Sequence, residues 1–138
     1  MEIAIIADDK KKELMTQFCI AYCGILSRHH ICATQVTGKY IADATGLTID
    51  YLMAGQGGNQ QVASRIAYDE IDVLFYFRDS EKQGTDYEND LLRLCDMHNV
   101  PVATNIATGE VLVMALDSGA LDWRELINPR SEYNRKKR

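Results

Sequence analysis

The chain has few of the features that mark a membrane, secreted or nucleic-acid-binding protein. It has only 2 prolines among its 138 residues. No apolar segment approaches the roughly 18 residues needed to span a bilayer, and the N-terminus lacks the basic and long apolar regions of a secretory signal. The formal net charge of −5 disfavours broad binding to nucleic acid or anionic lipid. We therefore expect one cytoplasmic domain, in the host cytoplasm if the gene is viral, with no nucleic-acid or membrane partner.

Motifs of several common chemistries are also missing. Cys19 and Cys23 are four residues apart, but the sequence has no CxxC pair and no nearby histidine, so we expect free thiols and no metal. A GxSxG elbow and a P-loop GK[ST] are absent. His29, His30 and His98 have neither the spacing of metal ligands nor that of a catalytic dyad, and we interpret them as structural. No cofactor is expected.

What is present is an alternation of strands with amphipathic helices. Five segments have strand character, and they are Glu2–Ala7, His30–Thr34, Ile49–Met53, Asp72–Phe77 and Val102–Thr104. Such alternation predicts βαβ units and a parallel sheet with helices on both faces. In these sheets ligands bind beyond the carboxyl ends of the strands.

Polar clusters follow the predicted strands at those ends. Asp8–Lys12 places three lysines in a first helical turn, against the helix dipole. A bound phosphate would explain them, and a solvated run of charges is the structural alternative. Thr34 and Thr37 precede or open the next helix, where Thr37 could also serve only as a cap. A third cluster begins at Arg78.

Gly55–Gly58 forms a glycine-rich segment that we predict to be a loop. Its backbone N–H groups can approach a phosphate closely, because glycine has no side chain in the way. Asn59 is the expected N-cap of the helix that follows. By itself this segment is a weak indication of phosphate binding.

Taken in order, these segments resemble the methylglyoxal synthase family over nearly the whole chain. The matching stretches are IAIIADDKKK (3–12), ATQVTG (33–38), ATG (44–46), GQGGNQ (55–60), DVLFYFRD (72–79), LLRLCD (91–96) and VPVATNIAT (100–108). The resemblance implies a three-layer α/β fold with a five-stranded, mainly parallel sheet and helices on both faces, assembled as a homohexamer. It also implies an enzyme that converts dihydroxyacetone phosphate to methylglyoxal and phosphate without a metal or organic cofactor. We expect residues 1–128 to form this domain and 129–138 a basic C-terminal tail.

The resemblance also implies residue roles. In the family, the residues matching Lys12, the threonines around Thr34 and Thr37, and the glycine-rich loop hold the phosphate. The full set of predicted ligand-binding residues is Asp8, Lys12, Thr34, Thr37, Gly38, Gly55, Gly57, Gly58, Asn59, Arg78 and Asp86. A C-terminal arginine of the family can reach a neighbouring subunit, and Arg130 and Arg135 are the candidates here.

The chain departs from the family pattern at several of these positions. The family loop GPxGGDQ contains the catalytic aspartate, whereas this shorter loop has Asn59, an amide that cannot accept a proton. General-base catalysis is worth about 10²–10⁴-fold. The family's histidine after the first strand is Asp8, its GTTG is Gln35–Gly38, and its PHxPD segment is Gln83–Tyr87, where Asp86 is the candidate second aspartate. So many separate changes indicate natural divergence.

Three hypotheses follow from this pattern. The preferred one is a non-catalytic protein that senses or sequesters a phosphorylated metabolite or nucleotide-derived signal. The second is an active synthase that uses another carboxylate near the site as its base; Asp8 is one candidate, and Asp9 and Asp79 are the predicted catalytic residues if the protein is active. The third is an interaction protein with a vestigial pocket.

Overall fold

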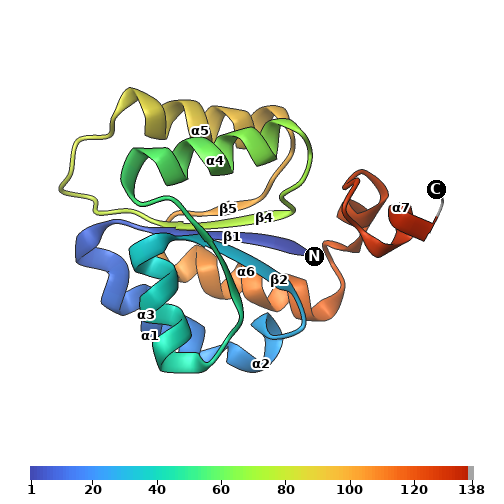
Figure 1. The fold of residues 1–138 in the computed structure, drawn as a ribbon, viewed down its shortest axis with the longest axis horizontal. Coiled ribbons are helices and arrows are strands. Elements are labelled where there is room, and N and C mark those ends of the chain that lie inside the picture. Colours follow the sequence, from blue (N-terminus) through green and yellow to red (C-terminus); the bar gives the residue numbers. More distant parts are fainter. Residues whose placement is uncertain (137–138) are drawn as a thin grey trace.

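A five-stranded parallel sheet lies between two layers of helices in the computed structural model, which describes residues 1–136 (Figure 1). The elements are β1 (Glu2–Ala7), η1 (Asp9–Lys11), α1 (Lys12–Ala21), α2 (Cys23–Leu26), β2 (His30–Thr34), α3 (Gln35–Thr45), β3 (Ile49–Leu52), α4 (Gly55–Ala67), β4 (Val73–Phe77), α5 (Asp86–Met97), β5 (Val102–Ala103), α6 (Ile106–Ser118), η2 (Asp122–Leu126) and α7 (Glu132–Lys136). The predicted three-layer α/β fold is confirmed, and every strand pair is parallel.

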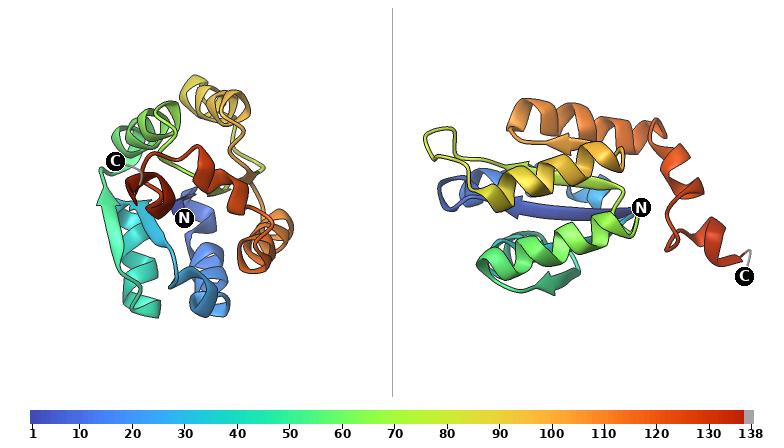
Figure 2. Two further views of the ribbon diagram at one scale, coloured as in Figure 1. Left: turned by 90° about the vertical axis from the view of Figure 1, so that its right-hand side faces the viewer. Right: turned by 90° about the horizontal axis from the view of Figure 1, so that it is seen from above.

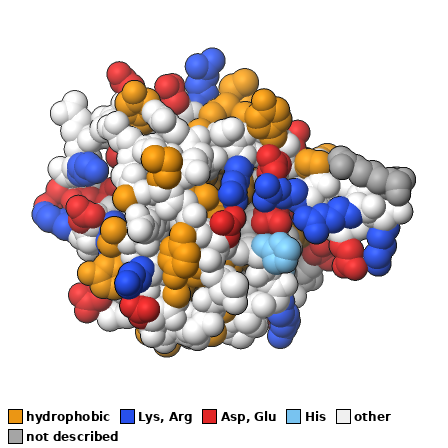
Figure 3. Space-filling view, viewed as in Figure 1, with side chains coloured by type: hydrophobic (Ala, Val, Ile, Leu, Met, Phe, Trp, Pro, Cys, Tyr) orange, Lys and Arg blue, Asp and Glu red, His pale blue; other side chains and the backbone are white. Residues whose placement is uncertain are grey.

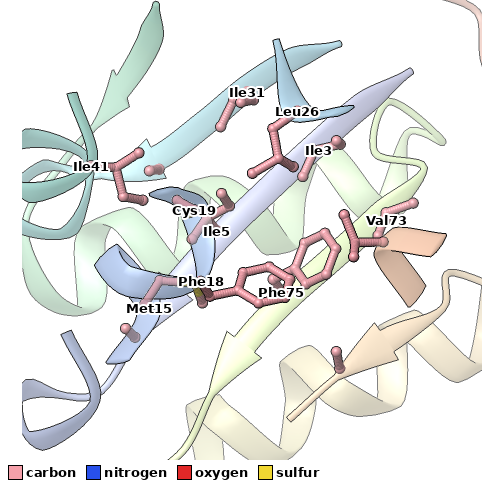
Figure 4. Packing of buried hydrophobic residues seen from close by; sticks show 14 of the residues in the cluster. Ile3, Ile5, Met15, Phe18, Cys19, Leu26, Ile31, Ile41, Val73 and Phe75 are labelled. Atoms are coloured by element: carbon pink, nitrogen blue, oxygen red, sulfur yellow. The ribbon is translucent and has the colours of Figure 1, made fainter. Parts of the chain in front are cut away.

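Alternation along the strands builds a core on each face of the sheet. Ile3, Ile5 and Phe75 point to the face covered by α1, α3 and α6, where Phe18 packs against Phe75 with ring centroids 5.4 Å apart (Figure 4). Tyr76 points to the opposite face of the sheet, where it belongs to a second core cluster with buried residues of α4 and α5. Both faces are buried, which explains why the strand sequences are almost continuously apolar.

The strand order β3-β2-β1-β4-β5 fixes where a ligand can bind. From the central strand β1, the chain proceeds outward through β2 and β3 on one side, and through β4 and β5 on the other. The loops at the carboxyl ends therefore diverge beside β1 and leave a crevice between them. The polar clusters predicted from the sequence lie at this edge.

The glycine-rich segment differs from its prediction. It is not a loop but the first turn of α4, which begins at Gly55 with Ala54 as its N-cap, so Asn59 is the fifth residue of the helix and not a cap. Close packing explains the glycines. A Cβ on Gly58 would lie 2.1 Å from the Met53 carbonyl oxygen and 2.7 Å from Thr34 Cγ2. Only glycine allows the helix to begin so near the strand ends.

The C-terminal segment extends away from the opposite edge of the sheet, beyond the N-terminus of β1 (Figure 2). It consists of η2 and α7, and Arg124 of η2 is fully buried. Lys137 and Arg138 of the predicted basic tail lie outside the described residues, and the tail and the homo-oligomer stay predictions. Among residues 1–136, no helix has the length and apolar character required to cross a bilayer.

Candidate functional site

A cavity of about 280 Å³ opens at the carboxyl ends of β1, β2 and β3. This volume is near the lower end of the roughly 300–1,000 Å³ typical of ligand pockets and suits a small molecule. In the view of Figure 3, lysine and acidic side chains gather at the left edge, where η1 and the β4–α5 loop lie in Figure 1. The lining residues are Ile6, Ala7, Asp8, Asp9, Lys12, Thr34, Val36, Ala54, Gly55, Gln56, Asn59, Tyr76, Lys82, Thr85, Tyr87 and Glu88.

Two helices begin at the cavity with open N-terminal ends. Thr34 is the N-cap of α3 and Ala54 that of α4, and neither makes a side-chain cap hydrogen bond within the described chain. The first N–H groups of a helix have no intrahelical partner, and together with the helix dipole they attract anions. By contrast, Thr85 and Glu88 close the N-terminus of α5 with a complete capping box. The cavity is therefore suited to an anion on its α3–α4 side.

Lys12 contributes a positive charge close to these helix ends. Its Nζ donates to the Ala7 carbonyl at 2.8 Å and lies 3.0 Å from Asp9 Oδ1, and its side chain is 17% exposed. The hydrogen bond from Lys12 holds the pKa of Asp9 below its ordinary value, although Asp9 is fully exposed. These contacts position the ammonium group where the sequence predicted a phosphate ligand.

Asp8 is a more sheltered carboxylate, with 10% of its side chain exposed. It directly follows β1, the central strand, and its Oδ2 accepts a hydrogen bond from the Asp79 backbone N–H at 2.7 Å. The other oxygen, Oδ1, lies 3.8 Å from Lys82 Nζ. One oxygen therefore accepts a hydrogen bond from the β4–α5 loop, and the other faces the Lys82 ammonium group at the cavity.

Glu88 and Lys82 are cavity residues that sequence reasoning missed. Glu88 is buried; its Oε2 accepts from the Thr85 N–H at 3.3 Å and lies 3.5 Å from Arg78 Nη2, and its Oε1 lies 3.6 Å from Lys82 Nζ. The TxxE pattern of the capping box was readable in the sequence. No sequence pattern indicated Lys82, because its side chain reaches the cavity only through the folding of the β4–α5 loop.

The structure brings together only part of the predicted set. The predicted residues that line the cavity are Asp8, Asp9, Lys12, Thr34, Gly55 and Asn59. Those that do not line it are Thr37, Gly38, Gly57, Gly58, Arg78, Asp79 and Asp86. Several of these have structural contacts: Arg78 stacks over Tyr76, and Gly38 packs beneath Tyr51. Thr37 is buried, and its hydroxyl has no hydrogen-bond partner among residues 1–136.

Tyr76 also lines the cavity. Burial, reinforced by the nearby carboxylates of Asp8 and Glu88, raises the pKa of Tyr76 well above its ordinary value, so this phenol stays neutral. Within the described part of the chain, no three histidine, cysteine or acidic side chains are grouped so that they could hold a metal ion. The polar groups available are therefore carboxylates, two ammonium groups, amides and hydroxyls.

Comparison with known proteins identifies relatives of this chain. The family described as "MGS-like domain" matches residues 16–104. Methylglyoxal synthase of Caldicellulosiruptor saccharolyticus is 52% identical over 98% of both chains. The enzyme of that name from Oceanobacillus iheyensis is 46% identical over 96% of both. The crystal structure of methylglyoxal synthase from Elizabethkingia anophelis matches with a TM-score of 0.74 and 32% identity, covering 81% of this chain and 76% of that one.

These relatives overturn the preferred functional hypothesis. A non-catalytic sensor or sequestering protein was predicted because Asn59 occupies the family's catalytic position. That prediction is wrong, since the relatives that match nearly the full length at 44–52% identity are named methylglyoxal synthases. Asn59 and the other departures from the family pattern weighed too heavily against agreement over the rest of the sequence. The family match, the relatives and the fold agree, and the chain belongs to the methylglyoxal synthase family.

Proposed function

We propose that this protein is an active methylglyoxal synthase that eliminates phosphate from dihydroxyacetone phosphate. The observation that carries the proposal is the 52% identity to a named synthase over 98% of both chains. The cavity supports it, because it combines an anion-binding side with sheltered carboxylates in a volume suited to a triose phosphate.

The phosphate lies at the side of the cavity formed by α3 and α4. Lys12 supplies an ammonium group, and the first N–H groups of α3 and α4 supply neutral donors. The Thr34 hydroxyl lies at the same edge and has no cap bond that would occupy it within the described chain. Charge-assisted hydrogen bonds of this kind are the strong ones in phosphate recognition.

Asp8 is the general base of the proposed reaction. Three acidic side chains line the cavity, and the other two are less suitable. Asp9 is fully exposed and holds Lys12, while Glu88 uses one oxygen to cap α5 and to face Arg78. Asp8 is sheltered at the carboxyl end of the central strand, and one of its oxygens has no hydrogen bond in the described structure. Asn59 lines the same cavity and can donate an amide N–H to a substrate oxygen.

The reaction balances without an added cofactor. The base removes a proton from the hydroxymethyl carbon, the C–H electron pair forms a C=C bond, and the carbonyl oxygen becomes the oxyanion of an enediolate. As the hydroxyl oxygen loses its proton and forms the aldehyde C=O bond, the C=C bond shifts and phosphate leaves with the C–O electron pair. The resulting enolate takes the first proton on its methylene carbon to give methylglyoxal, and the hydroxyl proton ends on phosphate.

A direct assay tests the proposal. The purified protein incubated with dihydroxyacetone phosphate is expected to release methylglyoxal and phosphate in equal amounts, measured by trapping the dicarbonyl and by a phosphate assay. The control is the same substrate without protein, because triose phosphates also eliminate phosphate slowly in solution. Release at the rate of the protein-free control would overturn the proposed function.

Lys12→Met tests the phosphate side of the cavity. Hydrogen bonds to charged groups contribute about 1.5–3 kcal/mol, so the variant is expected to bind inorganic phosphate roughly 10- to 150-fold more weakly. Isothermal titration calorimetry measures the change. Lys39→Met is the matched control, because Lys39 is exposed on α3 and does not line the cavity. Equal phosphate affinities of the two variants would show that Lys12 does not hold the phosphate.

A further inference from the structure

The proposed reaction develops negative charge at two places, and the cavity has two cations. One place is the departing phosphate, and the other is the carbonyl oxygen as it becomes an enediolate. Preorganised donors at a developing oxyanion are commonly the largest single contribution to catalysis. Among the described residues that line the cavity, Lys12 and Lys82 are the cationic ones, and none is a histidine.

The carboxylates around Lys82 indicate which of the two lysines binds the phosphate and which faces the carbonyl oxygen. Asp8 Oδ1 lies 3.8 Å from Lys82 Nζ, and Glu88 Oε1 lies 3.6 Å from it. A phosphate dianion placed there would meet two sheltered carboxylates, whereas the carboxylate paired with Lys12, that of Asp9, is fully exposed to solvent and the helix ends beside Lys12 attract anions. The phosphate therefore belongs beside Lys12, and the carbonyl end of the substrate extends toward Lys82.

The Lys82 ammonium group can still donate hydrogen bonds to a substrate. Both carboxylate contacts are longer than a hydrogen bond, and the side chain is 51% exposed at the cavity. The ammonium group is thus attracted to the site, and its N–H groups have no acceptor at hydrogen-bond distance within residues 1–136. A substrate oxygen that enters between the two carboxylates would meet this donor.

The backbone of the β4–α5 loop holds Lys82 in place. The Lys82 N–H donates to the Asp79 carbonyl at 3.1 Å, and the Asp79 N–H in turn donates to Asp8 at 2.7 Å. On the far side of the turn, Glu81 pairs with Lys10 of η1 at 3.8 Å. These contacts fasten the loop across the edge of the cavity, so that the Lys82 ammonium group faces the end of β1.

We propose that Lys82 is a catalytic residue that stabilises the enediolate oxyanion of the substrate. The assignment rests on the proposed synthase function. Lys82 acts only as a hydrogen-bond donor: it donates to the carbonyl oxygen while Asp8 takes the carbon-bound proton, and no proton or electron pair passes to it. Glu88 is a positioning residue that keeps the ammonium group between the base and the substrate.

Kinetics of Lys82→Met test this assignment. Removing one oxyanion donor typically costs about 10²–10³-fold in kcat, so we expect a loss of that size with a smaller change in KM. Lys82→Arg is expected to retain more of the activity than Lys82→Met, because it keeps the charge. Lys39→Met, a change of an exposed lysine on α3 that does not line the cavity, is the matched control and is expected to leave kcat within about threefold of wild type. A Lys82→Met variant as active as the control would overturn the assignment.

Binding measurements separate this inference from the proposed function. Phosphoglycolate carries a phosphate and a planar carboxylate that imitates the enediolate, whereas inorganic phosphate carries only the first group. Lys82→Met is expected to weaken phosphoglycolate binding at least about tenfold and to leave phosphate binding unchanged, while Lys12→Met weakens both. An equal loss of both ligands in Lys82→Met would overturn the assignment. If wild type releases no methylglyoxal, the proposed function fails, and phosphoglycolate binding alone then decides whether Lys82 contacts the anion.

Discussion

Replacing Asp8 with asparagine is expected to lower kcat for methylglyoxal formation by about 10²–10⁴-fold, the usual range for loss of a general base. The substitution is nearly isosteric, and its amide oxygen can still accept the hydrogen bond from the Asp79 N–H. The fold and the β4–α5 loop should therefore remain intact. Initial-rate kinetics with dihydroxyacetone phosphate measure the effect, and circular dichroism verifies the fold.

Asp9→Asn is the matched control for the base. Asp9 precedes Lys12 by three residues and lines the same cavity, but its side chain is fully exposed and its partner is Lys12. We expect the change to raise KM modestly through Lys12 and to leave kcat within about tenfold of wild type. A loss of 10²-fold or more in Asp9→Asn with an active Asp8→Asn would assign the base to Asp9.

Arg124→Ala is expected to destabilise the fold by about 3–5 kcal/mol, the range for breaking a buried ion pair from one side. Arg124 is fully buried, and its guanidinium donates to the carbonyls of Ile71 at 2.8 Å, His98 at 2.9 Å and Asn99 at 3.1 Å. Its Nε lies 3.7 Å from the buried carboxylate of Asp72. The variant leaves three carbonyls and one carboxylate without this partner. Urea unfolding followed by circular dichroism measures the free energy of unfolding.

An exposed arginine provides the control for this stability measurement. Arg28 pairs with Asp117 at 3.2 Å on the surface, so Arg28→Ala is expected to cost less than about 1 kcal/mol. Similar losses in the two variants would show that the buried guanidinium contributes no more than a surface pair. Arg124→Lys should fall between them, because lysine keeps the charge but cannot donate from one planar group in three directions.

The pH dependence of the Arg124→Ala deficit has a predictable sign. Burial already raises the pKa of Asp72 in the folded state, and the attraction of Arg124 opposes that rise. Without Arg124 the folded-state pKa rises further, so the folded variant binds a proton that the unfolded chain has released. Its stability then falls as pH rises above the unfolded value of about 3.9. The deficit relative to wild type should therefore be smallest in acid, and a deficit that grows as pH falls would contradict the assignment.

The parallel sheet could be predicted because the information for it is local. Continuous apolar runs such as Asp72–Phe77, alternating with amphipathic stretches, are compatible with few structures other than a sheet covered on both faces. The first turn of α4 could not be predicted in the same way. Glycines have poor helix propensity, and the reason for them is a close approach to Met53 and Thr34 from other segments. Propensity describes the chain alone, whereas that contact exists only in the folded protein.

The candidate site also contains residues that could be predicted from the sequence and residues that could not. Lys12 and Thr34 stand beside strand ends that the sequence reveals, so their place at the cavity could be predicted, whereas Asn59 was placed there by the resemblance to the family's loop. Lys82 and Glu88 reach the cavity through a turn, a capping box and side-chain contacts with Asp8 and Arg78. Interactions between residues some seventy positions apart, such as Asp8 with Asp79, leave no periodic trace in the sequence.

By itself, the sequence determined the α/β class, the strands and the edge of the sheet at which the polar clusters lie. These follow from hydrophobic periodicity and from the rule that the loops at the carboxyl ends of parallel strands form the ligand-binding edge. Only the tertiary structure decided which charged groups share the cavity. Charge–charge interactions depend on distance and burial, and both are set by loop closure and not by position along the chain. For this reason Lys82 and Glu88 could be assigned to the site only from the folded structure, in which the β4–α5 loop lies against the end of β1.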